Sequence, residues 1–219
     1  MIHPGSQETY NTIISQLPEN LHWGRMGIVG ILGDLAVSSS KGAILEIGMG
    51  ESTVYLTKLA EKYNRQAFFC DFQASVVLNA STVPGYFGKK YIIRTENEDL
   101  DGFAENLVYL GTSDSLFRKY KFPPLALAFL DGDHIYEQVK KDFENILPYL
   151  EDTGIILLHD TYPPSEEYTH EARCGTVYKL RQELEKREDL DVITFIRGAM
   201  DVGLTVVRRI KENMPEYQR

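Results

Sequence analysis

The chain has 219 residues, of which 43% are hydrophobic and 25% are charged. This composition is typical of a globular protein, and the length favours one domain with a full core. The formal net charge of −9 argues against a non-specific nucleic-acid or anionic-membrane surface, because both need basic patches. The longest apolar run, residues 26–37, is too short to span a bilayer and contains Asp34.

Two further features of the sequence indicate in which cellular compartment the protein is found. The N-terminus shows no signal-peptide pattern, and the two cysteines, Cys70 and Cys174, have neither metal-binding nor redox spacing. We therefore expect a cytoplasmic protein with reduced thiols.

The N-terminal segment, residues 1–42, is predicted to be helical and carries glycines three residues apart: Gly24, Gly27, Gly30 and Gly33. A glycine inside a helix costs roughly 1 kcal/mol relative to alanine. The spacing therefore indicates either a close backbone approach, to a ligand or a neighbouring helix, or an irregular boundary between loop and helix. Such a helix could also serve a homo-oligomer.

From residue 43 to about residue 160, strand-like and helix-like segments alternate. Strands are predicted at 43–47, 66–70, 107–110, 125–130 and 154–158, and helices include 52–63 and the apolar face that begins at Tyr136. Strands that are apolar on both faces and joined by helices indicate a parallel sheet covered on both sides. A helix at about 176–186 then leads to two β-rich runs, 192–196 and 202–207, which predict an antiparallel hairpin.

The predicted fold is thus α/β, with a doubly wound, mostly parallel, seven-stranded Rossmann-like sheet that ends in a C-terminal antiparallel hairpin. Residues 79–106 are longer than a crossover needs, so we expect an insertion with its own short strand at 91–94. The main domain is expected at 43–209, followed by a polar tail at 210–219.

The most informative segment is a buried strand that runs into a glycine turn, Ile-Leu-Glu-Ile-Gly-Met-Gly-Glu-Ser-Thr at residues 44–53. A dinucleotide site needs a third glycine, and here Thr53 occupies that position. The turn instead offers the carboxylate of Glu46, which suits a ligand with positive charge and hydroxyl groups. S-adenosylmethionine is such a ligand, so the motif favours a methyltransferase over the alternative, a nicotinamide-dependent oxidoreductase.

Several motifs occur together in a recognisable order: Glu46-Ile47-Gly48-Met49-Gly50, Asp71, Gly111-Thr112-Ser113-Asp114-Ser115, Asp131-Gly132-Asp133-His134 and His159-Asp160. Over residues 43–207 the chain resembles the class I S-adenosylmethionine-dependent methyltransferases. It is most similar to the branch with the cephalosporin-hydroxylase-type and macrolide-sugar O-methyltransferases. This resemblance implies O-methylation of a small hydroxylated molecule, such as a sugar or natural product, and the C-terminal hairpin is the usual ending of that class.

The cofactor site is expected at the glycine turn and the next strand ends. Gly48 and Gly50 would let the backbone pass close to the methionine part of the cofactor. Glu46 would face its amino group directly or through water, or else cap the turn. Asp71, at a strand tip, would accept the ribose hydroxyls, or else be a solvated strand-end residue. The predicted cofactor-binding residues are Glu46, Gly48, Gly50, Ser52, Asp71, Ser113 and Asp131.

Catalysis is expected where the fourth and fifth predicted strands end. Asp131 and Asp160 should meet at one rim, where two carboxylates repel each other unless a cation or proton lies between them. The resemblance implies a divalent metal, Mg²⁺ or another ion, with Asp131, Asp160 and His159 as predicted ligands. His134 matches the general-base position, so His134 and Asp131 are the predicted catalytic residues.

The pair His159-Asp160 departs from the family pattern of two acidic or amide residues. Histidine is a poor Mg²⁺ ligand, so His159 either faces elsewhere or favours manganese, iron or zinc. Asp133 could supply the missing ligand. Alternatively, Asp131 or Asp133 caps the helix that begins at Tyr136 and no metal binds.

The acceptor surface has no readable motif. The loop 161–173 follows the catalytic strand, and its His170 and Arg173 could bind an acidic or sugar-like substrate or could simply be solvated. A third possibility for the whole protein is a non-catalytic subunit that keeps the cofactor fold as a scaffold.

Overall fold

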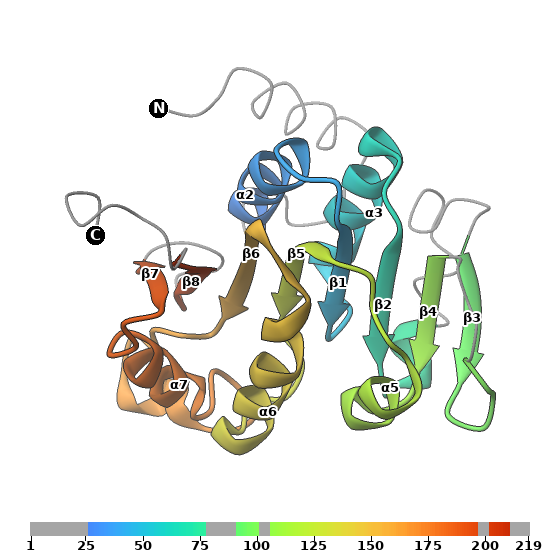
Figure 1. The fold of residues 1–219 in the computed structure, drawn as a ribbon. Coiled ribbons are helices and arrows are strands. Elements are labelled where there is room, and N and C mark those ends of the chain that lie inside the picture. The colour runs from blue at the N-terminus through green and yellow to red at the C-terminus, as the bar shows by residue number, and fades with distance from the viewer. Residues whose placement is uncertain (1–25, 78–90, 101–105, 197–201, 211–219) are drawn as a thin grey trace.

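The computed structural model describes residues 26–77, 91–100, 106–196 and 202–210 (Figure 1). Its strands are β1 (Ala43–Ile47), β2 (Ala67–Asp71), β3 (Tyr91–Thr95), β4 (Asn106–Leu110), β5 (Leu125–Leu130), β6 (Leu150–His159), β7 (Leu190–Phe195) and β8 (Leu204–Arg209). Its helices are α2 (Gly27–Ser38), α3 (Glu51–Tyr63), α5 (Ser113–Lys119), α6 (Tyr136–Ile146) and α7 (Val177–Leu184), with the 3₁₀ turns η1 (Leu147–Tyr149) and η2 (Glu166–Thr169).

All eight strands form one sheet in the order β3-β4-β2-β1-β5-β6-β8-β7. The pairs from β3 through to β6 are parallel, and β8 pairs antiparallel with both β6 and β7. Every residue of β1, β2 and β5 is buried, as expected for central strands covered on both faces. The predicted fold class, including the terminal antiparallel hairpin, is confirmed.

The sheet has eight strands rather than the predicted seven. The additional strand is β3, the short strand that the sequence predicts inside the insertion, and it lies parallel to β4 at the edge of the sheet. Its residues are half-buried or exposed, and such a short edge strand carries no sequence signal that shows whether it joins the main sheet. The rest of the insertion lies largely outside the described residues, so the predicted domain limits stay predictions.

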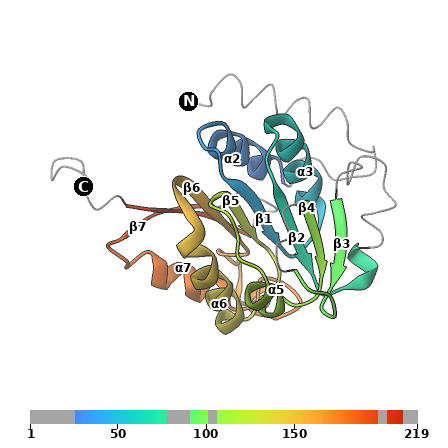
Figure 2. The same cartoon turned by 45° about the vertical axis from the view of Figure 1, so that its right-hand side comes forward.

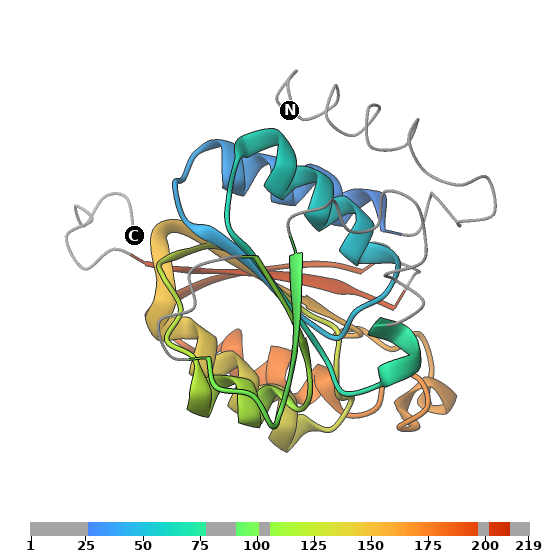
Figure 3. The same ribbon diagram turned by 90° about the vertical axis from the view of Figure 1, so that its right-hand side faces the viewer.

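Helices cover both faces of the sheet, as Figure 3 shows with α2 and α3 above it and the other helices below. Two groups of buried side chains fill these layers, one between the sheet and α2 and α3 and the other between the sheet and α5, α6 and α7. The turned view in Figure 2 shows α5, α6 and α7 following one another along their face. No helix in the described ranges is long and apolar enough to cross a membrane.

The glycines of α2 lie against the neighbouring layer. A Cβ on Gly33 would lie 2.7 Å from Leu59 of α3 and 3.0 Å from Leu127 of β5, and one on Gly30 would lie 3.0 Å from the Tyr55 ring of α3. At these two positions the predicted close approach is therefore to a neighbouring helix and to the sheet. Gly24 lies outside the described residues.

Candidate active site

A cavity of about 480 Å³ opens where the parallel strands end. Its wall comes from the segments after β1, β2, β4 and β5 and from the first turns of α6, as expected for an open α/β sheet. Polar and aromatic residues of this wall include Asp71, Phe72, Ser113, Asp114, Asp131, Asp133, His134, Gln138 and Asp142. Another hollow, lined by Pro124 and residues 148–153, lies at the opposite, amino-terminal ends of β5 and β6.

The glycine turn is fixed by its contact with the segment after β5. Gly48 has a φ of 87°, and a Cβ there would lie 2.1 Å from the carbonyl oxygen of Asp131. Both the left-handed backbone and the close approach therefore require glycine. A Cβ on Gly50 would meet nothing within 4 Å, and Thr53, which replaces the third glycine of a dinucleotide motif, accepts the Gly50 N–H at 2.9 Å.

Asp71 is held by backbone N–H groups of the segments that follow β1 and β2. Its Oδ2 accepts the N–H of Met49 at 2.9 Å, and its Oδ1 accepts the N–H of Gln73 at 2.7 Å. The residue is 8% exposed and lines the cavity. The carboxylate is thus oriented, and each oxygen keeps a further acceptor site.

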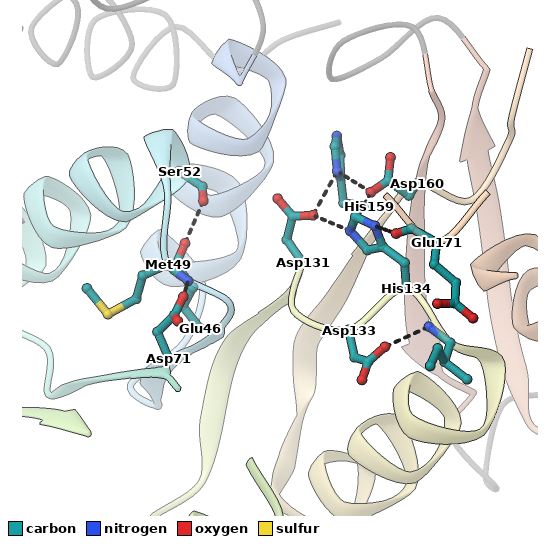
Figure 4. Close-up of polar contacts among 11 residues, drawn as sticks. Glu46, Met49, Ser52, Asp71, Asp131, Asp133, His134, His159, Asp160 and Glu171 are labelled. Carbon is teal, nitrogen blue, oxygen red and sulfur yellow. Dashed lines mark hydrogen bonds and ion pairs between the residues drawn. The ribbon is translucent and has the colours of Figure 1, made fainter. Parts of the chain in front are cut away.

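Glu46 and Ser52 lie beneath the turn, outside the set of residues that line the cavity. Both are fully buried, and the Ser52 hydroxyl donates to Glu46 Oε1 at 2.5 Å (Figure 4). The other oxygen, Oε2, has no hydrogen-bond partner among the described residues. Burial raises the pKa of Glu46 to about 8, although the hydrogen bond from Ser52 lowers it. The carboxyl group is therefore protonated at neutral pH.

Two aspartates and two histidines meet at the ends of β5 and β6, shown on the right of Figure 4. His134 Nε2 lies 3.0 Å from Asp160 Oδ2 and 4.0 Å from Asp131 Oδ1. His159 Nδ1 lies 2.9 Å from Asp131 Oδ1 and 3.3 Å from Asp160 Oδ2. The structure therefore brings together all four residues that the sequence predicts for the base and the metal ligands.

The electrostatics of this cluster follow from its pairing. The hydrogen bond to Asp160 raises the pKa of His134. Burial opposes charge on His159, but Asp131 and Asp160 outweigh it and its pKa lies well above the ordinary value. Asp160, although buried, has a lowered pKa because both imidazoles face it. Protons on the imidazoles thus separate two carboxylates that would otherwise repel each other.

The ring of His134 is fixed from the other side by the segment before α7. Its Nδ1 lies 3.3 Å from the carbonyl oxygen of Glu171, and its own carbonyl accepts the N–H of Thr176 at 2.8 Å. Because a carbonyl and a carboxylate only accept, the protonated ring donates from Nδ1 to Glu171 and from Nε2 to Asp160. The neutral ring keeps the Nδ1 proton and has its lone pair on Nε2. The Thr176 hydroxyl in turn accepts the first amide of α6, from Tyr136, at 2.8 Å.

Asp160 has an unusual backbone, with a φ of 57°. Few residues other than glycine adopt this left-handed conformation, and such outliers cluster at functional sites. The following residues hold it: the Thr161 hydroxyl accepts from Thr205 at 2.8 Å, and the N–H of Tyr162 donates to Val202 at 2.8 Å. This backbone turns the Asp160 side chain toward the two histidines.

The structure also places three residues whose roles the sequence leaves open. Asp133 accepts the N–H of Ile135, the residue before α6, at 2.9 Å, and among the described contacts it makes no hydrogen bond to an amide of the first helical turn. In the late loop, the guanidinium of Arg173 lies 4.5 Å from the centre of the Tyr168 ring. His170 accepts the N–H of Ala172 at 3.2 Å. Both proposed substrate-binding side chains thus make contacts within their own loop.

The sequence did not single out three residues of the cavity wall: Phe72, Gln138 and Asp142. Phe72 follows Asp71 and is 68% exposed. Gln138 and Asp142 lie one turn apart on α6, and Asp142 is only 2% exposed. The sequence offered one signal for Asp142: an acidic residue next to Phe143, at a position that falls on the apolar face of that helix.

The family comparison identifies the chain more narrowly. A family model described as a methyltransferase domain matches residues 45–161, more than half of the chain. No curated protein sequence matches the chain.

Solved methyltransferase structures share the fold at low sequence identity. The methyltransferase PaMTH1 from Podospora anserina, bound to S-adenosylhomocysteine, is 16% identical, with a TM-score of 0.60 over 96% of this chain and 89% of that one. The O-methyltransferase TomG from Streptomyces achromogenes, in complex with S-adenosylmethionine, is 14% identical, with a TM-score of 0.59 over 95% and 91%. MycE, from the mycinamycin biosynthetic pathway, was solved with Mg, S-adenosylhomocysteine and mycinamycin VI. It is 14% identical, with a TM-score of 0.55 over 97% of this chain and 57% of that one. The chain belongs to the methyltransferase domain family, and its identification from sequence as a class I S-adenosylmethionine-dependent methyltransferase is confirmed.

Proposed function

We propose that this methyltransferase transfers the methyl group of S-adenosylmethionine to a hydroxyl oxygen of a small molecule, such as a sugar or natural product. The observation that carries the proposal is the cluster of His134, Asp131 and Asp160 at the rim of the cavity that Asp71 lines. Asp71 would accept the ribose hydroxyls, which leaves the sulfonium methyl free to face this cluster.

In the proposed reaction the acceptor oxygen forms a bond to the methyl carbon as the carbon–sulfur bond breaks. The electron pair of that bond stays on sulfur and gives S-adenosylhomocysteine. The hydroxyl proton passes to Nε2 of His134, whose Nδ1 proton is already engaged by the Glu171 carbonyl. Nε2 lies 3.0 Å from Asp160 Oδ2, so the acceptor hydroxyl would take the place of this contact and donate to Nε2.

We further propose that a divalent ion assists, as the donor set of this site fits one. Ligand atoms of Asp131, His134 and Asp160 all lie within 4.8 Å of one another. The two carboxylates supply the oxygen ligands that a hard ion such as Mg²⁺ or Mn²⁺ prefers. A bound ion would lower the pKa of the acceptor hydroxyl.

The roles of His134 as base and as ligand use the same nitrogen and exclude each other, because Nδ1 faces the Glu171 carbonyl. We assign it the base role, with Asp131 and Asp160 as ligands. His159 donates from Nδ1 toward both carboxylates, so it orients them in this proposal and does not itself bind the ion.

The test is calorimetric titration of EDTA-treated protein with S-adenosylmethionine, followed by transfer of a labelled methyl group to a panel of hydroxylated sugars and phenols. Micromolar cofactor binding and labelling of a hydroxyl oxygen are expected. Cofactor binding with every hydroxyl compound unlabelled, but an amine or carboxylate labelled, would contradict O-methylation. Binding with no acceptor class labelled would favour a non-catalytic scaffold, and no cofactor binding by folded protein would exclude the proposal.

A further inference from the structure

One end of the cavity wall is built around the amide of Gln138. Its Nε2 lies 3.1 Å from Asp142 Oδ1, 3.2 Å from the hydroxyl oxygen of Ser113 and 3.4 Å from Asp114 Oδ1. These partners come from the start of α5 and from the next turn of α6. A single amide nitrogen is therefore surrounded by three oxygen atoms.

This arrangement fixes which way round the amide lies. Ionised carboxylates only accept hydrogen bonds, so the side of Gln138 that faces Asp114 and Asp142 must be its NH₂ group. The reverse orientation would set the carbonyl oxygen of Gln138 against two carboxylates. Oε1 therefore points away from these partners, and it has no bond to another described side chain, although Gln138 lines the cavity.

Both carboxylates are ionised above pH 6. Asp114 pairs with Lys141 at 2.5 Å, and this hydrogen bond lowers its pKa. Asp142 has no cationic partner among the described residues, and burial raises its pKa to about 6. A buried carboxylate without a cation is costly, so its retention beside the cavity calls for a role.

We propose that Gln138 Oε1 accepts a hydrogen bond from the exocyclic amine of the cofactor's adenine, and that Asp142 holds the amide in the orientation this requires. The inference rests on the proposed function. If the ribose lies at Asp71 and the methyl group faces His134, then the polar wall left for the base includes Ser113, Asp114, Gln138 and Asp142.

The consequence is selectivity against a deaminated base. Hypoxanthine carries a carbonyl oxygen where adenine carries the amine, so two acceptors would face each other at Gln138. Sites built to hydrogen-bond one donor reject analogues that lack it, because the buried polar group is then left unpaired. Gln138 thus determines specificity, and Asp142 is a positioning residue that acts through it.

The experiment compares calorimetric binding of S-adenosylhomocysteine and its deaminated analogue S-inosylhomocysteine. Wild-type protein should prefer the adenosyl compound by at least about tenfold. Gln138→Leu should weaken binding of the adenosyl compound by about tenfold and remove most of the preference. Asp142→Asn should lower the preference as well, because an asparagine amide can donate to Oε1 and let Gln138 turn round. Exposed Glu137, on the same helix turn, supplies the control Glu137→Gln, which should keep the wild-type ratio.

An unchanged ratio in Gln138→Leu, with the adenosyl compound still bound, overturns the inference and leaves the proposed function standing. Wild-type protein that binds neither compound overturns both. If Gln138→Leu does not fold, Asp142→Asn is the deciding variant, because it preserves the side-chain volume. An affinity ratio for the two compounds equal to that of wild type would then contradict both the role of Asp142 and the fixed orientation of the Gln138 amide.

Discussion

Gly48 and Asp131 approach so closely that a Cβ on Gly48 would lie 2.1 Å from the Asp131 carbonyl oxygen. The two residues end adjacent parallel strands, and the N–H of Asp131 donates to the Ile47 carbonyl at 2.9 Å. The glycine turn and the segment after β5 are therefore one packed unit. Gly48 was expected because a Cβ would clash with the cofactor, but the contact with the protein's own backbone already requires a glycine there.

Gly48→Ala should therefore destabilise the fold itself. The added methyl group meets backbone atoms that cannot rotate away, and the left-handed φ adds strain, so we expect a loss of about 2–4 kcal/mol in the free energy of unfolding. Urea denaturation of the ligand-free protein measures it. Gly50→Ala is the matched control, because its Cβ would meet nothing within 4 Å. Equal stability of Gly48→Ala and wild type would contradict this reading of the turn.

Asp71→Asn should weaken cofactor binding while leaving the fold intact. The amide keeps one acceptor oxygen, but its NH₂ group then faces either the N–H of Met49 or that of Gln73. Loss of charged hydrogen bonds to the ribose predicts about 10- to 100-fold weaker binding of S-adenosylmethionine. Calorimetry measures the affinity for S-adenosylmethionine, with Glu61→Gln, a substitution of an exposed residue on α3, as the control. Wild-type affinity in Asp71→Asn would exclude the ribose role.

Glu46→Gln should flatten the pH dependence of stability. The pKa of Glu46 is raised from 4.5 to about 8 in the folded protein, so the folded state keeps a proton that the unfolded state loses. Stability of the wild type therefore falls as pH rises from about 4.5 to about 8. The loss of stability above that range is on the order of 5 kcal/mol. The variant should lack this slope and exceed wild type in unfolding free energy at alkaline pH, as urea titrations across the range would show. Parallel curves for Glu46→Gln and wild type would contradict the buried, protonated state, and Glu188→Gln at the surface is the control.

The sequence was sufficient for the sheet apart from β3, and for bringing Asp131, His134, His159 and Asp160 together. Parallel strands place their ends on one edge, so Asp71, Asp131 and Asp160 could be assigned to one rim from strand positions alone. The placement of β3 could not be predicted, because a short edge strand has no buried face to define its partner.

The side-chain orientations could not be predicted from the sequence either. Whether Glu46 faces the cavity or the core depends on how the turn folds against Asp131, a contact far apart in sequence. Gln138 and Asp142 lie on a helix face that carries no binding motif, and the orientation of the Gln138 amide depends on its contact with Asp114 of α5.

Metal binding should require both carboxylates of the cluster. EDTA-treated wild-type protein titrated with MnCl₂ should bind one ion, because Asp131 and Asp160 together supply two charged oxygen ligands. Asp160→Asn should weaken Mn²⁺ binding at least about tenfold, since one charged ligand is lost. Asp133→Asn is the matched control, because Asp133 accepts the Ile135 N–H before α6 and makes no contact with Asp131 or Asp160 in the described contacts. Equal Mn²⁺ affinity in Asp160→Asn and wild type, or no Mn²⁺ binding to wild type, would contradict the proposed metal site.

His134→Gln should separate catalysis from cofactor binding. Glutamine can keep a hydrogen bond toward Asp160 but cannot take up a proton at neutral pH, so kcat should fall by about 10²- to 10⁴-fold. The dissociation constant for S-adenosylmethionine should change little, because the base contacts the acceptor rather than the cofactor. His170→Gln controls for loss of a histidine in the neighbouring loop, where His170 bonds only within that loop among the contacts described. Methyl transfer at the wild-type rate in His134→Gln would exclude the base role. The proton would then have to leave by another route, such as directly to Asp160 or to solvent.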